Sequence, residues 1–454
     1  MIVKKSVLCV AYGGRMETYM KYALAIDIGA SSGRHIVGWE EGGEIKTEEI
    51  YRFPNGMDTV DGHLVWDTDR LFLEVKRGLK LSLEKYPTLS CLSIDTWGVD
   101  YVLMKGGEEI KPTYAYRDSR VDGPIKEVHN IIPFAELYSK VGTQFNSFNT
   151  IYQLYADKIA GRLEGVTDFL MIPEYLMYKL TGVKKKEFTD ATTTGLINQE
   201  SLKFDAEIWQ ALGFPEELRA QLHSPGTLLG KLKSEIATEV GGNLDVILCA
   251  THDTASAVEA IDMETNSPYI SSGTWSLLGV KTERALTDEG SRLADYSNEG
   301  GVGYNRYQKN ITGMWIIQSL RKELCPETSY GDIADMAASS DFCELFDVND
   351  ASFMAPKSMK AAIRDYLVNS GKPEPKTDAD YFNSAYHSLA AGYSEAIAAL
   401  EANTGKSYPE IYIVGGGAKN KYLNSLTEKY TGKRVRALPI EATAIGNLKI
   451  QLKR

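Results

Sequence analysis

The order of apolar and polar positions predicts strands at the start of the chain. An apolar run at residues 22–28 is followed by Gly29-Ala30-Ser31-Ser32-Gly33, and strand-like character resumes at residues 35–39. A third run of strand type covers residues 44–53. Because glycine and serine between two such runs are typical of a tight turn, we expect the chain to open with an antiparallel meander.

Helical spacing then alternates with further strands. Residues 71–86 place leucine and valine on one face and end before Pro87, which predicts a helix. Apolar runs at residues 91–94 and 101–104 predict strands, and residues 130–180 are mostly of helical type. Residues 189–194 are a turn rich in hydroxyl groups. This mixture indicates an α/β fold.

A similar arrangement begins again in the second half of the chain. The apolar run 245–250 leads into Thr251-His252-Asp253-Thr254, and a helical stretch follows at residues 255–260. Residues 269–280 then give a strand, a turn of serine, glycine and threonine, and a second strand, which is the order seen at residues 22–39. The repetition predicts two domains built alike that face each other across one ligand.

The remaining elements are read from shorter patterns. We expect a glycine turn at residues 298–303, a helix at 311–324, a strand at 411–414 that ends in Gly415-Gly416-Gly417, and helices at 421–430 and 442–448.

A chain of 454 residues is too long for one compact core. Pro215, Pro225, Gly230 and Gly241-Gly242 interrupt the pattern, so we place an N-terminal domain at residues 20–243 and a C-terminal domain at residues 244–454. We expect residues 1–19 to be a leader of doubtful order. Its apolar run is short and no cleavage site follows, which argues against a signal peptide.

Composition and charge narrow the classes of partner. The chain is 43% hydrophobic and 24% charged, which is typical of globular proteins, and its net charge of −11 disfavours nucleic acid or an anionic membrane as a partner. The five cysteines are odd in number and lack zinc spacing, which favours reduced thiols and a cytoplasmic protein. A monomer and a homodimer are both compatible with these observations.

Several segments are candidates for ligand contacts. In the turn at residues 29–33, backbone N–H groups and serine hydroxyls can face phosphate oxygens, while Asp27 at the strand end can hold a hydrated divalent cation. An ordinary hairpin turn is the alternative for so short a motif. The glycines at 415–417 could let a ring or a phosphate lie close to the backbone, or could form a hinge.

Two further segments carry polar and aromatic groups. Residues 95–100, Asp-Thr-Trp-Gly-Val-Asp, stand at a strand end, where ligands often bind in α/β proteins, although the tryptophan could equally fill a domain edge. Arg117 and Arg120 could clamp an anion or a polyol, but solvated loop charges are the default interpretation.

Six segments taken together resemble the FGGY family of carbohydrate kinases: 27–34, 95–100, 116–120, 251–257, 271–276 and 415–417. The resemblance extends from about Met20 to the end of the chain. It implies two actin-like, ribonuclease-H-type domains around a central cleft that close over ATP and a ketose. It also implies transfer of the γ-phosphoryl group of MgATP to O1 of L-rhamnulose. A kinase for another deoxyketose such as L-fuculose, and an actin-like sensor without catalysis, are the alternatives.

The resemblance also assigns individual residues. The implied ATP contacts are Ala30, Ser31, Ser32, Gly33, Arg34, Thr274, Gln318 and Gly416. The implied sugar contacts are Gly98, His252, Asp253, Thr254 and Asn310. Asp253 falls on the position of the catalytic base, and Asp27 would hold Mg²⁺ through water. Residues 1–19 have no counterpart in the family pattern. The same pattern leads us to expect further helical sequence after Arg454.

Overall fold

The computed structural model describes residues 20–263, 266–438 and 441–453, which form two compact units. Unit 1 contains the described residues up to Ala260 together with Asn298–Tyr304 and the C-terminal segment from Ala442. Unit 2 contains the described residues of Ile261–Ser297 and Asn305–Glu441. The predicted division after residue 243 falls just before a strand of unit 1, β16 (Asp245–Ile247), so Asp253 also belongs to unit 1.

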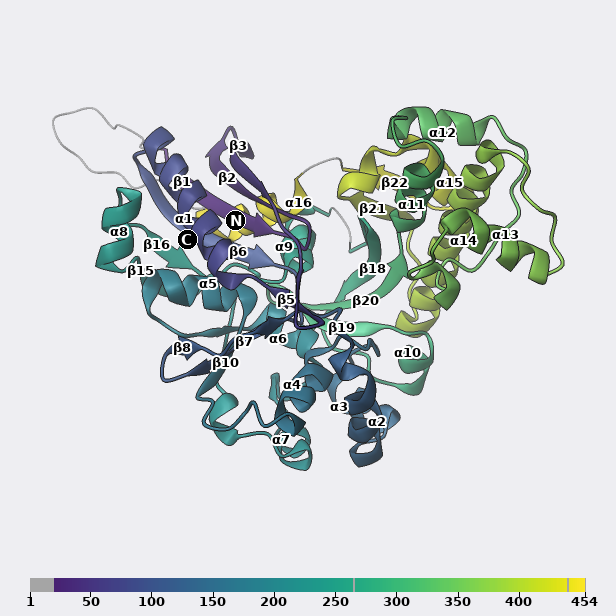
Figure 1. The fold of residues 1–454 in the computed structure, drawn as a ribbon. Helices are drawn as coiled ribbons and strands as arrows, with labels where there is room; N and C mark the ends of the chain where they lie inside the picture. The colour runs from purple at the N-terminus through teal and green to yellow at the C-terminus, as the bar shows by residue number, and fades with distance from the viewer. Residues whose placement is uncertain (1–19, 264–265, 439–440, 454) are drawn as a thin grey trace. The chain divides into compact units, whose positions relative to one another are not determined.

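Unit 1 is built on a six-stranded sheet of order β15-β16-β6-β1-β2-β3 (Figure 1). The predicted meander is confirmed, because β1 (Tyr22–Ile28), β2 (Ser32–Glu41) and β3 (Glu44–Pro54) pair antiparallel in succession. On the other side of β1 the strands β6 (Leu89–Thr96) and β16 run parallel to it, and β15 (Leu228–Lys231) closes the edge.

The two faces of this sheet carry different residues of the same strands. Leu24 and Ile26 of β1 pack into a core with helices α1 (Thr68–Lys85) and α5 (Ile172–Thr181). Ala23 and Ala25 instead pack against α16 (Ala442–Leu452). Successive side chains of a strand point to opposite faces, so Asp27 continues the α16 face at the carboxyl end of β1.

A second core of unit 1 surrounds Trp209 and lies among shorter elements. Its strands and those beside it are β4 (Asp58–Val60), β5 (His63–Trp66), β7 (Tyr101–Lys105), β8 (Glu108–Glu109), β9 (Thr113–Tyr114), β10 (Asp168–Met171), β11 (Lys186–Glu187), β12 (Ile197–Asn198), β13 (Lys203–Phe204) and β14 (Leu222–His223). The remaining helices of the unit are α2 (Asp122–Ile131), α3 (Phe134–Val141), α4 (Thr150–Ile159), α6 (Phe188–Ala191), α7 (Ala206–Leu212), α8 (Ser234–Val240) and α9 (Asp253–Ala260).

Five strands of unit 2, in the order β22-β21-β17-β18-β20, repeat the order β16-β6-β1-β2-β3 of unit 1. Strands β17 (Tyr269–Ser272), β18 (Trp275–Thr282) and β20 (Asn305–Thr312) form an antiparallel meander, and β21 (Glu410–Val414) and β22 (Arg434–Ala437) extend parallel from β17. The prediction that the two halves are built alike is therefore confirmed.

Helices cover one face of this second sheet and form its core. They are α11 (Trp315–Leu324), α12 (Tyr330–Ala338), α13 (Met359–Asn369), α14 (Asp378–Thr404) and α15 (Lys421–Thr431), while α10 (Glu289–Leu293) precedes β19 (Ser297–Gly300). The 27-residue α14 is not predicted from the sequence pattern, because it is buried almost all round at residues 381–390 and shows no clean polar face.

Several predicted elements are wrong in their type or bounds. The glycine turn expected at residues 298–303 begins as strand β19, and the mostly helical stretch 130–180 contains strand β10. The helix expected at residues 311–324 begins only at Trp315, because β20 continues to Thr312. The turn expected at 189–194 is the short helix α6 followed by a 3₁₀ turn. Glu187 accepts hydrogen bonds from the Thr189 and Asp190 backbone N–H groups (2.8 and 3.2 Å), which caps this helix.

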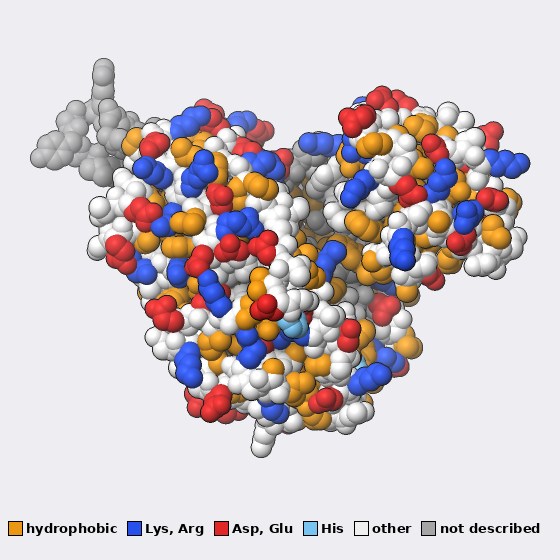
Figure 2. Space-filling view, in the orientation of Figure 1, with side chains coloured by type: hydrophobic (Ala, Val, Ile, Leu, Met, Phe, Trp, Pro, Cys, Tyr) orange, Lys and Arg blue, Asp and Glu red, His pale blue; other side chains and the backbone are white. Residues whose placement is uncertain are grey.

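The described part of the chain has no helix that is both long and apolar enough to span a membrane. Its four cysteines, Cys91, Cys249, Cys325 and Cys343, are free thiols. Acidic and basic side chains are interspersed on the visible face of each unit, so neither sign dominates that face (Figure 2). The predicted leader at residues 1–19 lies outside the described residues.

Candidate active site

The turn between β1 and β2 is closed by its own backbone. The Gly29 N–H donates to the Ser32 carbonyl (2.9 Å), and Asn55 bonds the carbonyls of both Ser31 and Gly29 (2.9 Å each). Ser31 is exposed, so its hydroxyl is available to a ligand. A side chain at Gly33 would lie 2.2 Å from the Phe53 ring, so the glycine at this position is explained by packing against the core.

Asp27 and Arg34 bind each other across this hairpin. They are register partners on β1 and β2, and both Nε and Nη2 of Arg34 donate to Asp27 Oδ2 (2.9 and 2.8 Å). Two predicted ligand contacts, one for the cation and one for ATP, are therefore adjacent in the structure. The Arg34 guanidinium compensates the negative charge of the Asp27 carboxylate beside the turn at residues 29–33.

Asp95 is a third charged residue at this place, and the sequence prediction does not assign it a role. It is the parallel register partner of Asp27, fully buried at the end of β6. Its Oδ2 accepts a hydrogen bond from Asn447 Nδ2 of α16 (2.5 Å), whereas its Oδ1 has no hydrogen-bond partner among the described residues. Burial, followed by the charges of Asp27 and Asp253, raises the pKa of Asp95 well above its usual value.

These carboxylates fit a bound cation. A buried carboxylate oxygen without a partner is costly unless a proton or a cation satisfies it, and Mg²⁺ prefers oxygen ligands and retains water. The described residues contain no compact group of three or more acidic, histidine or cysteine side chains that would hold a metal directly. The arrangement therefore suits an ion held partly through water.

The segment that carries Asp253 leaves the sheet at the same carboxyl end of the strands. Residue 252 pairs with Thr96 in a parallel bridge, and the Thr96 N–H donates to the Thr251 carbonyl (2.9 Å). Asp253 is the first residue of α9, and the Thr254 hydroxyl donates to its Oδ1 (3.0 Å). Its side chain is 31% exposed, which leaves the carboxylate accessible.

Glu187 holds the segment at residues 251–253 in place through hydrogen bonds. Its fully buried carboxylate accepts hydrogen bonds from the Thr251 hydroxyl and N–H (2.8 and 3.1 Å) as well as from Thr189. Burial raises the pKa of Glu187, and these hydrogen bonds oppose the rise. Asp190 is likewise buried, and burial together with Glu174, Glu187 and Asp253 raises its pKa well above the usual value. Asp253 therefore stands among several buried acids.

Gly98 lies on a strained turn that Thr193 holds in place. A Cβ at Gly98 would lie 2.9 Å from Thr193 Cγ2, and the Val99 N–H donates to the Thr193 hydroxyl (3.1 Å). Val99 itself has φ of 70°, which is unfavourable for a β-branched residue. Such strain often marks a functional site. The neighbouring Asp100 accepts bonds from Trp66 and Trp97 (2.6 and 2.9 Å), and burial raises its pKa to about 6.

The two arginines of residues 116–120 differ in their surroundings. Arg120 pairs with the buried Asp157 (2.9 Å) and lies over the Tyr114 ring, so its role within unit 1 is structural. Arg117 lies over the neighbouring Tyr116 ring.

In unit 2 the structure brings three predicted ATP contacts to one end of the sheet. The Thr274 hydroxyl lies 3.4 Å from Gln318 Oε1, and the Trp315 N–H at the start of α11 donates to the Thr274 carbonyl (3.1 Å). The glycines beside Gly416 pack on Ser272, the residue that ends β17. Asn310, a predicted sugar contact, lies on β20 opposite Leu277.

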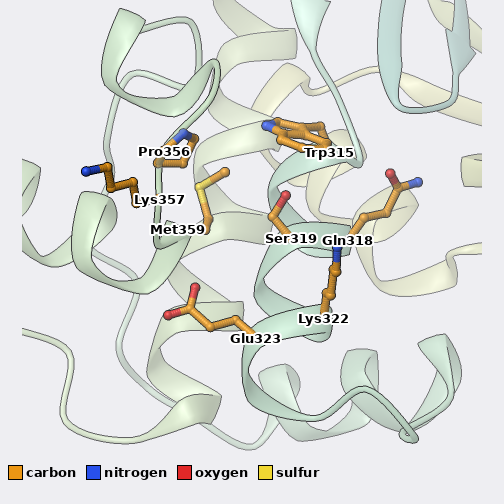
Figure 3. A pocket seen from close by; sticks show the side chains of 8 residues that line it. All are labelled: Trp315, Gln318, Ser319, Lys322, Glu323, Pro356, Lys357 and Met359. Atoms are coloured by element: carbon orange, nitrogen blue, oxygen red, sulfur yellow. The ribbon is translucent and has the colours of Figure 1, made fainter. Parts of the chain in front are cut away.

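A pocket of about 490 Å³ opens beside α11 in unit 2 (Figure 3). Its lining residues are Trp315, Gln318, Ser319, Lys322, Glu323, Pro356, Lys357 and Met359. Gln318 leaves α11 on the side away from Pro356 and Met359. The pocket thus borders one predicted ATP contact.

Comparison with known proteins shows the class to which this fold belongs, a carbohydrate kinase. Residues 22–259 match the N-terminal domain of the FGGY family of carbohydrate kinases, and residues 268–453 match its C-terminal domain. The chain therefore belongs to the FGGY family of carbohydrate kinases.

The similar curated proteins have a narrower common name. The chain is 40% identical to the rhamnulokinase of Oceanobacillus iheyensis, over 94% of this chain and 92% of that protein. It is 42% identical to the rhamnulokinase of Halalkalibacterium halodurans (95% and 93%) and 39% identical to that of Bacillus subtilis (94% and 89%).

Solved structures share the fold at much lower identity. A gluconate kinase from Lactobacillus acidophilus matches with a TM-score of 0.78 at 16% identity, covering 95% of this chain and 89% of that one. A xylulose kinase from the same organism matches with the same TM-score and identity, covering 95% and 88%.

Proposed function

We propose that this protein transfers the γ-phosphoryl group of ATP to O1 of L-rhamnulose, giving L-rhamnulose 1-phosphate and ADP, in the cytoplasmic catabolism of L-rhamnose. The observation that carries this proposal is the identity of about 40% to several rhamnulokinases over nearly the whole chain. The chain's own residues support the chemistry. The carboxylate of Asp253 is accessible, and it lies at the strand ends that also carry Asp27 and the turn at residues 29–33.

In this proposal Asp253 accepts the proton of the attacking O1 hydroxyl. Phosphoryl transfer needs mainly positioning and charge stabilisation, so no nucleophilic side chain is required. His252, Thr254, Gly98 and Asn310 would orient the sugar. Glu187 would keep Asp253 in place through Thr251, whose hydroxyl and N–H it binds.

The phosphate contacts are assigned to the two glycine-containing turns. The backbone of Ala30–Arg34 with its serine hydroxyls, and Thr274, would bind phosphate oxygens, while Gln318 and Gly416 would contact the adenosine side of ATP. Mg²⁺ would be held by Asp27 through water and would neutralise charge on the phosphates.

The test is ADP release measured across a panel of ketoses that includes L-rhamnulose and L-fuculose. We expect the highest kcat/KM with L-rhamnulose, and a phosphate on O1 by phosphorus NMR of the product. A higher kcat/KM with L-fuculose would identify a different deoxyketose kinase. ADP release with none of the sugars, despite nucleotide binding, would favour a non-catalytic sensor.

The adenosine contact can be tested at Gly416. A Cβ there would meet no atom within 4 Å, so Gly416→Ala should change the free energy of unfolding by no more than about 0.5 kcal/mol. If adenosine lies against this backbone, the same methyl should raise the Kd for ATP at least tenfold, measured by isothermal titration calorimetry.

Gly415→Ala serves as the contrast. Gly415 has φ of 83°, and its Cβ would lie 2.8 Å from the Ser272 carbonyl oxygen, so this variant should lose stability. An unchanged ATP affinity in a stable Gly416→Ala protein would remove Gly416 from the proposed nucleotide contacts.

A further inference from the structure

Glu299 lies beside His252, although 47 residues separate them in sequence. It belongs to Asn298–Tyr304, the short segment of the chain that returns to unit 1. Its neighbours fix this segment on both sides. The Asn298 N–H donates to the Gly142 carbonyl (2.8 Å), and the Gly300 N–H donates to the Thr192 hydroxyl (2.8 Å). The backbone at residue 299 is therefore held in one place.

The approach of this segment to α6 is close. A Cβ at Gly300 would lie 2.5 Å from the Phe188 ring, so a side chain at residue 300 would push the segment away. Gln199 Nε2 adds a further bond to the Asn298 carbonyl (3.2 Å). These contacts make the position of Glu299 a consequence of packing within unit 1, independent of any ligand.

The Glu299 carboxylate contacts one nitrogen of the His252 ring. Oε2 lies 3.2 Å from Nδ1, and the two side chains are only 12% and 11% exposed. An ionised carboxylate can only accept hydrogen bonds, so the proton of a neutral His252 ring is placed on Nδ1. Nε2 is then an acceptor, and it lies 3.7 Å from Asp253 Oδ1, which is too far for a hydrogen bond.

We propose that Glu299 is a positioning residue that fixes the tautomer and orientation of His252, so that Nε2 accepts a hydrogen bond from a sugar hydroxyl beside the one that donates to Asp253. This inference rests on the proposed function. It adds a specificity element to it. In the cyclic form of a ketose the O1 hydroxyl has the C2 hydroxyl as its neighbour, and two acceptors at this separation select a ligand with two such O–H donors. They disfavour the open-chain form, in which C2 is a carbonyl, and an analogue with a hydrogen in place of the C2 hydroxyl.

The first experiment reads the tautomer directly, in the unmodified protein. Nitrogen-15 NMR of protein labelled at its six histidines, with His252→Asn used for assignment, should show the Nδ1–H form for His252. In Glu299→Gln the population should shift towards Nε2–H, because an amide can donate to Nδ1 where a carboxylate cannot. The Nε2–H form in the unmodified protein would overturn the proposal.

The second experiment separates binding from turnover. In Glu299→Gln, loss of one charge-assisted hydrogen bond is expected to raise the KM for L-rhamnulose about 10- to 100-fold. The KM for ATP should stay within about twofold, and kcat should change by a smaller factor than the KM for L-rhamnulose. Glu259→Gln is the matched control. Glu259 accepts a hydrogen bond from Tyr304 of the same segment (3.2 Å), so it tests a general loosening of the segment.

An unchanged sugar KM in Glu299→Gln, or an equal increase in Glu259→Gln, would overturn the positioning role. If the unmodified protein turns over no ketose, the proposed function fails. The tautomer of His252, measured with and without Glu299, still decides whether Glu299 controls the ring.

Discussion

Asp253→Asn should lower kcat by two or more orders of magnitude while the Kd for ATP stays within about twofold. Asparagine keeps the shape of the side chain and an oxygen that can accept the Thr254 hydroxyl bond (3.0 Å), but it cannot take up a proton. A positioned general base contributes roughly 10²–10⁴ in rate, which sets the expected loss. The measurement is coupled ADP release with saturating sugar, together with calorimetric titration of ATP.

A control is needed because Asp253 is also the first residue of a helix. Loss of a negative charge in the first turn costs about 0.3–1 kcal/mol of helix stabilisation, which is too small to explain a hundredfold loss of turnover. Asp122→Asn makes the same change at the first residue of α2, where the side chain is exposed. It should leave kcat unchanged. Turnover within tenfold of normal in Asp253→Asn would remove Asp253 from the role of base.

The surroundings of Asp253 explain which parts of the site could be predicted from sequence. An apolar run that stops at Thr251-His252-Asp253 marks a strand end, and strand ends carry ligands in α/β folds. The apolar run at residues 22–28 likewise places Asp27 at the end of the first strand. Local patterns of this kind depend only on neighbouring residues, and the structure confirms them in β1 and β2.

Other parts depend on register and on distant contacts. Asp95 was visible in a polar motif, but only the pairing of β6 with β1 sets it against Asp27. Glu187 reaches Thr251 across 64 residues, and Glu299 reaches His252 from a segment with no motif of its own. Thr274 and Gln318 meet because the start of α11 bonds the turn after β17, a contact that no spacing rule specifies.

The C-terminal helix α16 makes the site sensitive to a packing position far from it in sequence. Asn447 of this helix binds Asp95, and Gln451 in turn donates to Asn447 Oδ1 (2.6 Å). Gly446, the residue before Asn447, faces α9, the helix that begins with Asp253. A single crossing of two helices therefore supports both the buried carboxylate and the proposed base.

Gly446→Ala should cause the largest loss of stability among single-methyl additions in unit 1. The added Cβ would lie 1.7 Å from the Ser256 carbonyl oxygen, which is backbone and cannot rotate away, so α9 and α16 must separate. Overpacking of this kind costs roughly 1–3 kcal/mol or more, whereas the higher helix propensity of alanine returns at most about 1 kcal/mol. Packing therefore dominates, and the urea midpoint should fall.

Gly123→Ala separates propensity from packing in the same unit. Gly123 lies in the first turn of α2, directly before Pro124, and a Cβ there would meet no atom within 4 Å, so alanine should change the free energy of unfolding by no more than about 0.5 kcal/mol. Urea unfolding followed by circular dichroism, analysed for two transitions because the chain has two units, compares the variants. If Gly446→Ala is as stable as Gly123→Ala, the close crossing of α9 and α16 does not exist in solution. If Gly446→Ala is destabilised, we also expect its kcat to fall, because the separation of the helices moves the segment that holds Asp253.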